Sequence, residues 1–294
     1  MDSDNTPALK RARSLLLPCA AAGARIALAA FLAVCGLAYA VQDRMIFYHV
    51  HDDRSRAYLH GRPGYAEVGF TAENGKTYHG MMYAASDAAA PLVLYFGGNG
   101  EVSYSNLRMR EALHEWPHFD GFHYLFVDYD GYGINGGRAH YRNMYEMALA
   151  AFDYAAGLPH VDADRIVAMG FSLGTGCAVH LAANRPVAGL ILAAPYANGY
   201  DLYNNVLPIF FGPMRLLVRQ KLPSDEYAPA VAAPALVIAS RRDEAIPFVS
   251  SERLSRLLGG DAAFVALNDA LHNEIFEAEG VWAEVRAFLR AFLG

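Results

Sequence analysis

The sequence predicts an α/β fold in which a mostly parallel sheet of eight strands carries helices on both faces. Short apolar runs rich in β-branched and aromatic residues alternate with longer amphipathic stretches, which is typical of this fold class. Nearly all of the later runs are too apolar to be half exposed, as expected for central strands of a parallel sheet. The first two runs are joined by a turn containing Asn74-Gly75, a strong hairpin signal, so we expect the sheet to begin antiparallel.

The changes of pattern along the chain set the expected bounds of each element. The expected strands are Tyr65–Thr71, Tyr78–Ala84, Pro91–Phe96, His123–Tyr129, Arg165–Gly170, Ala188–Ala194, Ala235–Ser240 and Ala263–Leu267. Helical spacing of apolar residues predicts helices over Val102–Trp116, Tyr141–Ala156, Leu173–Ala183, Val249–Leu258 and Gly280–Phe292. No linker or repeat divides residues 44–294, so we expect one domain there. With 54% hydrophobic residues in 294, the chain can bury a large core.

Residues 196–230 interrupt the alternation of strands and helices. This insertion is rich in Tyr, Pro and Leu and includes the apolar run 207–211. Ligands in open α/β sheets bind beyond the carboxyl ends of strands, where this insertion begins. It is therefore either a cap over a ligand pocket or a pair of helices that completes the outer layer.

Residues 1–43 differ in composition from the rest of the chain. Three basic residues at positions 10, 11 and 13 precede the apolar stretch Leu15–Val41, which only Arg25 interrupts. The uninterrupted part, from Ile26, is slightly shorter than the roughly 20 residues of a spanning helix. The basic flank predicts a single-pass N-terminal membrane anchor with the body of the chain on the extracytoplasmic side.

Two alternatives to an anchor stay open. Ala38-Tyr39-Ala40 has the small-x-small form of a signal-peptide cleavage site, and cleavage after Ala40 would release an exported soluble form. A soluble N-terminal helix is the other alternative.

Charge and cysteine content exclude several classes of partner. The net charge is −6 and no basic tract follows residue 13, so nucleic acid is not an expected partner. Cys19 and Cys35 lie in the apolar leader and Cys177 stands alone, which leaves no intradomain disulfide and no metal-ligand spacing. We expect a small-molecule substrate and neither a metal nor a cofactor.

Ser172 is the candidate nucleophile. It lies in Gly170-Phe171-Ser172-Leu173-Gly174, where an expected strand meets an expected helix. A G-x-S-x-G turn in that context lifts the serine hydroxyl clear of the backbone at the helix N-terminus. Average composition alone would give this pattern in about one chain in ten of this length, so the context carries the prediction. The alternative is a structural turn with a capping serine.

A serine hydroxyl needs a base, usually a histidine that a carboxylate orients. His272 lies in the loop after the last expected strand, whereas His180 lies within a helix and is expected to pack there. Asp243 follows the strand that ends at Ser240 and is the expected acid, with Glu244 and Asp201 as rivals. The order serine, acid, histidine is the one this type of turn is found with.

When a serine attacks a carbonyl group, the carbonyl oxygen becomes an oxyanion, which needs two hydrogen-bond donors. One is the backbone N–H of Leu173, which follows the nucleophile. The loop after the strand Pro91–Phe96 should supply the other, and within Gly97-Gly98-Asn99-Gly100 we expect it to be Asn99. No Lys-Ser/Thr pair or dinucleotide pattern accompanies these glycines, so phosphate binding is not supported.

These motifs resemble the α/β-hydrolase superfamily, in particular its N-terminally anchored, serine aminopeptidase-like hydrolase-domain proteins. The resemblance covers the chain from about Val41 onward and rests on Met45-Ile46-Phe47-Tyr48, Phe96-Gly97-Gly98-Asn99-Gly100, Asp128-Tyr129-Asp130-Gly131-Tyr132-Gly133, the Ser172 turn, Asp243 with Ile246-Pro247, and His272-Asn273. It implies an α/β-hydrolase fold, a Ser172, Asp243, His272 triad, and Asn99 and Leu173 as oxyanion donors. Members usually carry histidine where this chain has Gly97.

The expected function is hydrolysis of an ester or thioester through an acyl-enzyme on Ser172. The apolar insertion and the expected anchor favour a medium or long acyl group, with membrane lipid as a partner of the N-terminal segment. A peptidase or aminopeptidase with the same triad is one alternative. A membrane-attached binding protein that has lost turnover is the other, since a fold alone does not establish activity.

Overall fold

The computed structural model describes residues 7–113 and 121–293, and side chains within them except at 7–21, 38, 41, 45 and 113. Its centre is an eight-stranded sheet with strand order β1-β2-β4-β3-β5-β6-β7-β8. The strands are β1 Tyr65–Thr71, β2 Thr77–Tyr83, β3 Ala90–Phe96, β4 His123–Val127, β5 Val161–Phe171, β6 Gly189–Ala193, β7 Ala235–Ser240 and β8 Ala262–Leu267. Strand β2 pairs antiparallel with both β1 and β4, and the other neighbouring strands pair parallel, so the predicted mostly parallel sheet with an antiparallel start is confirmed.

Burial explains why the apolar runs became strands. Every residue of β4, β6 and β7 is buried, and β3 is buried from its second residue onward. By contrast β1, at the edge of the sheet, is mostly exposed or partly buried, with only Phe70 buried. The continuous apolar pattern of a central parallel strand is therefore what the sheet required.

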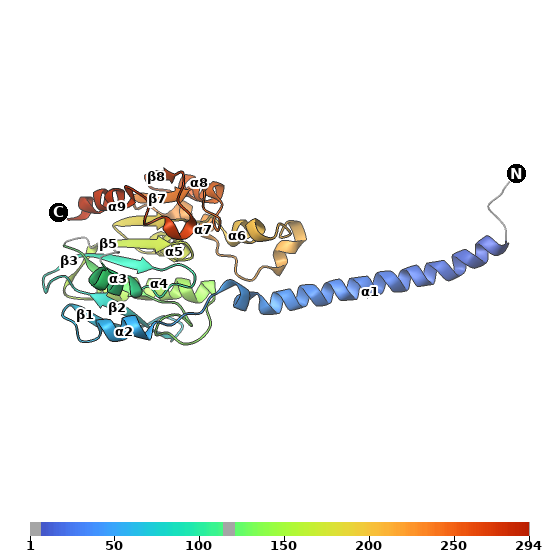
Figure 1. The fold of residues 1–294 in the computed structure, drawn as a ribbon, viewed down its shortest axis with the longest axis horizontal. Coiled ribbons are helices and arrows are strands. Elements are labelled where there is room, and N and C mark those ends of the chain that lie inside the picture. The colour runs from blue at the N-terminus through green and yellow to red at the C-terminus, as the bar shows by residue number, and fades with distance from the viewer. Residues whose placement is uncertain (1–6, 114–120, 294) are drawn as a thin grey trace.

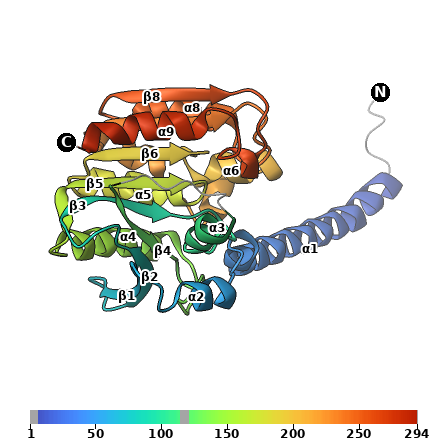
Figure 2. The same ribbon diagram turned by 60° about the vertical axis from the view of Figure 1, so that its left-hand side comes forward.

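Helices cover both faces of the sheet, as predicted. The helices of the body are α2 Asp53–Leu59, α3 Ser105–Leu113, α4 Tyr141–Ala156, α5 Gly174–Asn184, α6 Gly199–Val206, α7 Ser224–Tyr227, α8 Phe248–Leu257 and α9 Val281–Leu289. In Figures 1 and 2, α4, α5 and α8 lie on one face and α3 and α9 on the other. The helix expected over Val102–Trp116 begins only at Ser105, and its residues 114–120 lie outside the described part of the chain.

The insertion at residues 196–230 folds into several short helices rather than one long pair. Helix α6 is followed by the 3₁₀ turn η1 at Gly212–Leu217, then by α7 and a second turn, η2, at Ala228–Ala230. Its first and last parts are buried against α5 and α8, because Ala197, Leu222 and Ala228 have almost no exposed surface. Its middle projects from the body (Figure 1).

The N-terminal segment forms helix α1, Pro7–Ile46, which leaves the body as a single rod (Figures 1 and 2). Among the residues that the structure describes, no helix combines the length and the hydropathy needed to cross a membrane. The predicted membrane anchor is therefore not confirmed. The basic side chains at positions 10, 11 and 13 lie outside the described side chains.

Candidate active site

Ser172 occupies a strained turn between β5 and α5. Its φ is +49°, a left-handed conformation that is uncommon for a residue other than glycine and is found where surrounding structure enforces it. The backbone N–H of Ser172 donates to Ala193 O at 2.9 Å, and Thr175 Oγ1 donates to Ser172 O at 2.6 Å. These contacts fix the turn and leave the hydroxyl free to point away from the sheet.

The flanking glycines are required by close backbone packing. A Cβ on Gly174 would lie 2.1 Å from Phe96 O, and one on Gly170 would lie 2.6 Å from Gly174 O. No side chain fits at such distances. The G-x-S-x-G spacing thus reflects the crossing of the serine turn over the end of β3.

The structure brings Ser172, His272 and Asp243 together from three separate loops. His272 Nε2 lies 2.8 Å from Ser172 Oγ, and His272 Nδ1 lies 2.8 Å from Asp243 Oδ2. Because a carboxylate only accepts, Nδ1 carries the proton and Nε2 accepts the serine O–H. The Asp243 side chain is 2% exposed and that of His272 11%, so this chain of contacts is screened from water.

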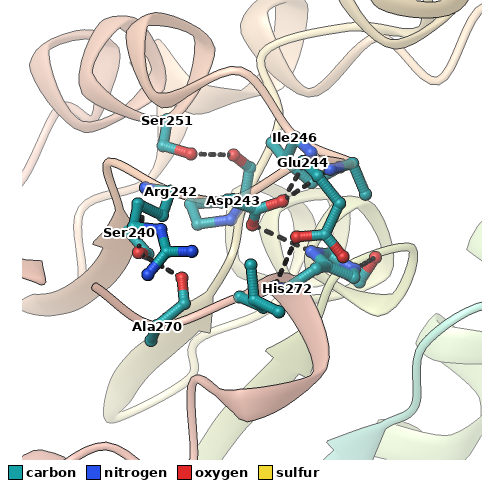
Figure 3. A network of polar contacts seen from close by, with 12 residues as sticks. Ser240, Arg242, Asp243, Glu244, Ile246, Ser251, Ala270 and His272 are labelled. Carbon is teal, nitrogen blue, oxygen red and sulfur yellow. Dashed lines mark hydrogen bonds and ion pairs between the residues drawn. The ribbon is translucent and has the colours of Figure 1, made fainter. Parts of the chain in front are cut away.

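The loop after β7, which carries Asp243, is held by its own backbone and by the loop after β8, which carries His272. Asp243 Oδ1 accepts the N–H groups of Ala245 and Ile246 at 2.9 and 2.7 Å. Ser240 Oγ, at the end of β7, donates to Ala270 O at 2.5 Å and ties the two loops together. Figure 3 shows this network around His272. The position of the carboxylate is therefore set before any substrate binds.

The two rival acids have other contacts. Glu244 Oε2 accepts the backbone N–H of His272 at 3.0 Å, which lowers the pKa of Glu244 and holds the histidine loop but leaves the ring untouched. Asp201 lies in α6, where it accepts from Ser250 Oγ at 2.5 Å and pairs with Arg253 at 2.7 Å. Of the three carboxylates, Asp243 alone reaches the imidazole.

His180 packs as the sequence predicted. Its ring stacks on Tyr145 and meets Tyr227 edge-on, with both centroid distances 4.5 Å. Burial lowers its pKa to about 4, because the charged imidazolium would lose its hydration there. It contacts no residue of the Ser172 site.

The expected oxyanion donors lie on the two loops beside the serine. Within the described part of the chain, no hydrogen bond uses the backbone N–H of Leu173 or of Asn99. The N–H of Gly98, by contrast, donates to Glu101 Oε2 at 2.6 Å. Of these two neighbouring amides, the N–H of Asn99 stays available for an oxyanion, whereas that of Gly98 does not.

The side chain of Asn99 has a structural part of its own. Its Nδ2 donates to Ile46 O at 2.7 Å, while its Oδ1 accepts the Tyr48 N–H at 3.0 Å and the Tyr132 O–H at 2.6 Å. The loop after β3 is in this way tied to the residues that leave α1.

Glu101 is a partly buried residue that the motifs of the sequence did not single out. Besides the Gly98 amide, its carboxylate accepts from Tyr95 Oη at 2.9 Å and from Asn106 Nδ2 at 2.7 Å, and burial raises its pKa. A Cβ on Gly97 would lie 3.0 Å from this carboxyl group. Glu101 therefore fills the space beside position 97 and braces the loop after β3. The spacing of Glu101, three residues after Gly98, was the sequence signal that could have indicated this contact.

A cavity of about 450 Å³ lies beside His272. It is lined by Tyr95, Glu101, Asn106, Met109, Phe171, Asn273, Phe276, Glu277 and Trp282. The Phe171 ring stacks on His272 at 5.2 Å and meets Phe276 at 5.4 Å, so one aromatic wall runs from the histidine into the cavity. The lining carries two carboxylates and no base, so it does not favour an anionic group.

Comparisons with known proteins agree with this fold. The model of the alpha/beta hydrolase fold family matches residues 91–212, and that of the serine hydrolase family matches residues 158–291. An uncharacterized protein of Mycobacterium tuberculosis is 33% identical over 206 residues, which cover 69% of this chain and 71% of the relative. The alpha/beta hydrolase domain-containing protein aho-3 of Caenorhabditis elegans is 33% identical over 132 residues, 44% of this chain and 38% of that protein.

Solved structures show the same fold at low identity. The Pyrococcus furiosus esterase Pf2001 superposes with a TM-score of 0.65 at 17% identity, covering 84% of this chain and 97% of that one. Acetyl xylan esterase 1 of a Thermoanaerobacterium species gives 0.62 at 17% identity, covering 78% and 83%.

Proposed function

The chain belongs to the α/β-hydrolase superfamily, and we propose that it hydrolyses an ester or thioester bond through an acyl-enzyme on Ser172. The observation that carries this proposal is the position of His272, 2.8 Å from Ser172 Oγ at one nitrogen and 2.8 Å from Asp243 at the other. This is the arrangement that activates a serine hydroxyl.

The proposed reaction has two halves. In the first, Ser172 Oγ attacks the carbonyl carbon while His272 Nε2 takes its proton, and the oxyanion accepts from the N–H groups of Asn99 and Leu173. The imidazolium, stabilised by Asp243, then protonates the leaving alcohol or thiol as its bond to carbon breaks. In the second half His272 removes a proton from water as the water attacks the acyl carbon. The imidazolium then returns this proton to Ser172 Oγ as the bond between Oγ and the acyl carbon breaks, which releases the acid.

Reaction with a fluorophosphonate probe tests the nucleophile directly. We expect labelling of the full chain and none of Ser172→Ala, with Ser224→Ala as a matched control that labels normally, because Ser224 is buried elsewhere in the insertion. Labelling that survives Ser172→Ala would refute the proposal.

We propose a medium or long acyl chain as the substrate group. The aromatic wall of the cavity beside His272 and the absence of a base in its lining support it. Two of the solved relatives are named as esterases, one of them for acetylated xylan. A series of p-nitrophenyl esters from acetate to laurate should give kcat/KM values that rise with chain length. Activity confined to acetyl esters, or to peptides, would overturn this assignment, and matched acyl thioesters separate the two bond types.

We further propose that α1 attaches the protein to a membrane, with the catalytic domain on the extracytoplasmic side. Ile26, Val34 and Leu37 are each 65% or more exposed on this helix, and no part of the body covers them. Resistance of the full chain to carbonate extraction, together with its digestion by protease added to intact cells, is the expected result. Full release into the carbonate supernatant would exclude the anchor, and mass spectrometry of the mature N-terminus tests cleavage after Ala40.

A further inference from the structure

The middle of the insertion exposes an unusual amount of apolar surface. Outside α1, nine large hydrophobic side chains are exposed among the described residues, and five of them lie between positions 206 and 216: Val206, Leu207, Ile209, Phe211 and Leu216. Val206 is 86% exposed and Leu216 is 83% exposed. Exposed apolar side chains concentrated in so short a segment indicate a site of interaction. We call residues 206–216 the cap loop.

The cap loop lies beside the C-terminal end of α1, where the helix joins the body. Gln42 Nε2 donates to Leu217 O at 2.9 Å, and the Arg219 N–H donates to Gln42 Oε1 at 2.8 Å. Gln220 Nε2 also donates to Asp43 Oδ1 at 2.7 Å, and Arg219 pairs with Asp43 at 3.2 Å. The helix therefore has no flexible linker to the body at this point. In both ribbon views the cap loop projects to the side from which α1 departs (Figures 1 and 2).

These hydrogen bonds fix the distance, along the axis of α1, between the cap loop and the apolar run of the helix. The run 26–41 ends one residue before Gln42, whose hydrogen bonds to Leu217 and Arg219 we call the docking contacts. At about 1.5 Å per residue, the last turn of the run lies within roughly 6 Å of these contacts along the helix axis. The run is about 24 Å long, less than the roughly 30 Å of a hydrocarbon core, so a bilayer that holds it must reach close to the body.

The charges around the cap loop fit a lipid surface. Residues 206–221 include Arg215, Arg219 and Lys221 and no acid, in a chain with a net charge of −6. Arg219 is paired with Asp43, whereas Arg215 and Lys221 are exposed. An apolar patch with basic residues beside it is the composition of segments that insert into the interface of an anionic bilayer.

We propose that the cap loop inserts into the interface of the bilayer that α1 enters, so that this part of the insertion rests on lipid. The proposal rests on the membrane attachment proposed above. The occupant of this surface is a bilayer containing anionic phospholipid rather than a second copy of the chain. An acyl substrate dissolved in that bilayer would then meet the cap directly.

Fluorescence of a labelled cap loop tests this placement. The full chain, with Cys19, Cys35 and Cys177 each replaced by Ala, receives a single NBD label at Phe211→Cys and is reconstituted into vesicles of phosphatidylcholine and phosphatidylglycerol. The matched control carries the label at Asp87→Cys, an exposed position just before β3 at the opposite edge of the sheet. We expect a blue-shifted label at position 211 that nitroxide lipids quench, and an unshifted, unquenched label at position 87.

The outcomes separate the proposals. Vesicles that float with the chain bound, but leave position 211 as exposed as position 87, overturn insertion and keep the anchor. A chain that does not float overturns both. A label at 211 that is shielded without quenching by lipid, and that transfers energy between differently labelled copies, assigns the surface to a second copy and also overturns insertion. Hydrolysis of a soluble p-nitrophenyl ester by each sample reports on the catalytic proposal independently.

A second variant tests the consequence for turnover. The double substitution Phe211→Ser, Leu216→Ser removes apolar surface from two residues that are 56% and 83% exposed. We expect unchanged kcat/KM for a soluble ester and a fall of about tenfold or more for the same acyl ester embedded in vesicles. Equal activity of both proteins on the embedded ester would contradict the proposal.

Discussion

The two neighbouring carboxylates on the loop after β7 give the sharpest test of the site. Asp243 and Glu244 both contact His272, the first at the ring and the second at the backbone N–H. Asp243→Asn and Glu244→Gln are nearly isosteric changes that remove one charge each. If the geometry determines their roles, the two variants should differ by several orders of magnitude in activity.

The magnitude follows from the contacts of each side chain. In Asp243→Asn the Oδ1 acceptor of the Ala245 and Ile246 amides can be kept, so the loop keeps its shape. The new amide NH₂ then faces Nδ1 of His272, and two donors cannot share a 2.8 Å contact. The imidazole must place its proton on Nε2, where it can no longer accept the Ser172 O–H. Such a loss lowers kcat by about 10⁴-fold, or roughly 5 kcal/mol in the barrier.

Glu244→Gln keeps an acceptor for the His272 N–H and removes only an exposed charge. Its loss should be less than about tenfold, the size of one weakened hydrogen bond. The assay is kcat/KM for a p-nitrophenyl ester together with the rate of fluorophosphonate labelling, with thermal unfolding to confirm that both variants fold. A fall of 10³-fold or more in Glu244→Gln, with Asp243→Asn nearly active, would refute the assignment of the acid.

Three further predictions concern stability and the oxyanion loop. Burial raises the pKa of Asp128 to about 7, so between pH 4 and 7 the folded chain binds more protons than the unfolded chain and stability falls as pH rises. Asp128→Asn should flatten this slope and add on the order of 3 kcal/mol at pH 8, and urea unfolding at pH 5 and pH 8 would show whether the slope persists. Glu101→Ala should lower kcat by about 10²-fold and Glu101→Gln by less, since the glutamine keeps one acceptor, so equal losses in the two variants would count against a bracing part for Glu101. Gly174→Ala forces a Cβ to 2.1 Å from Phe96 O and should cost more than about 3 kcal/mol, whereas Gly157→Ala meets only ordinary contacts and serves as the control in the same thermal unfolding assay.

The parts of the fold that could be predicted from the sequence are those with a long periodic signal. Helix α4 has the expected bounds, Tyr141–Ala156, because its apolar face is regular over four turns. The central strands were found because both faces are buried and the runs are continuously apolar. The short helix α2 was missed even though Asp52 caps it through the Ser55 N–H, since seven residues are too few for a periodic signal.

Strand β5 shows a limit of a different kind. Its expected start was Arg165, but the strand begins at Val161 because Ala90 pairs with that residue before the register shifts. Asp162 and Asp164 make this part polar, and only pairing with β3 turns it into a strand. Tertiary context therefore decided the boundary.

The candidate site also contains residues that the sequence predicted and one, Glu101, that only the fold reveals. Ser172, Asp243 and His272 stand at loop positions after strands, and parallel strands place such loops at one sheet edge, so the sequence alone grouped them correctly in space. Glu101 could not be assigned in this way, because its partners come from a strand, a loop and a helix that only the fold assembles. Bracing residues of this kind have no fixed motif, whereas the reacting groups do.

The same end of the molecule carries the exit of α1, the loop after β3 and the cap loop. Asn99 holds the chain at Ile46 and Tyr48 immediately after the helix, while the docking contacts at Gln42 lie on the other side of the same short stretch. A bilayer held by α1 would therefore lie against the end of the sheet that carries Ser172 rather than against the opposite end, where β3 begins. For a hydrolase of soluble esters this orientation would obstruct entry, whereas for one that draws acyl substrates from lipid it shortens their path to Ser172. The preference between soluble and vesicle-embedded esters is thus the measurement on which the anchor, the cap loop and the choice of substrate jointly depend.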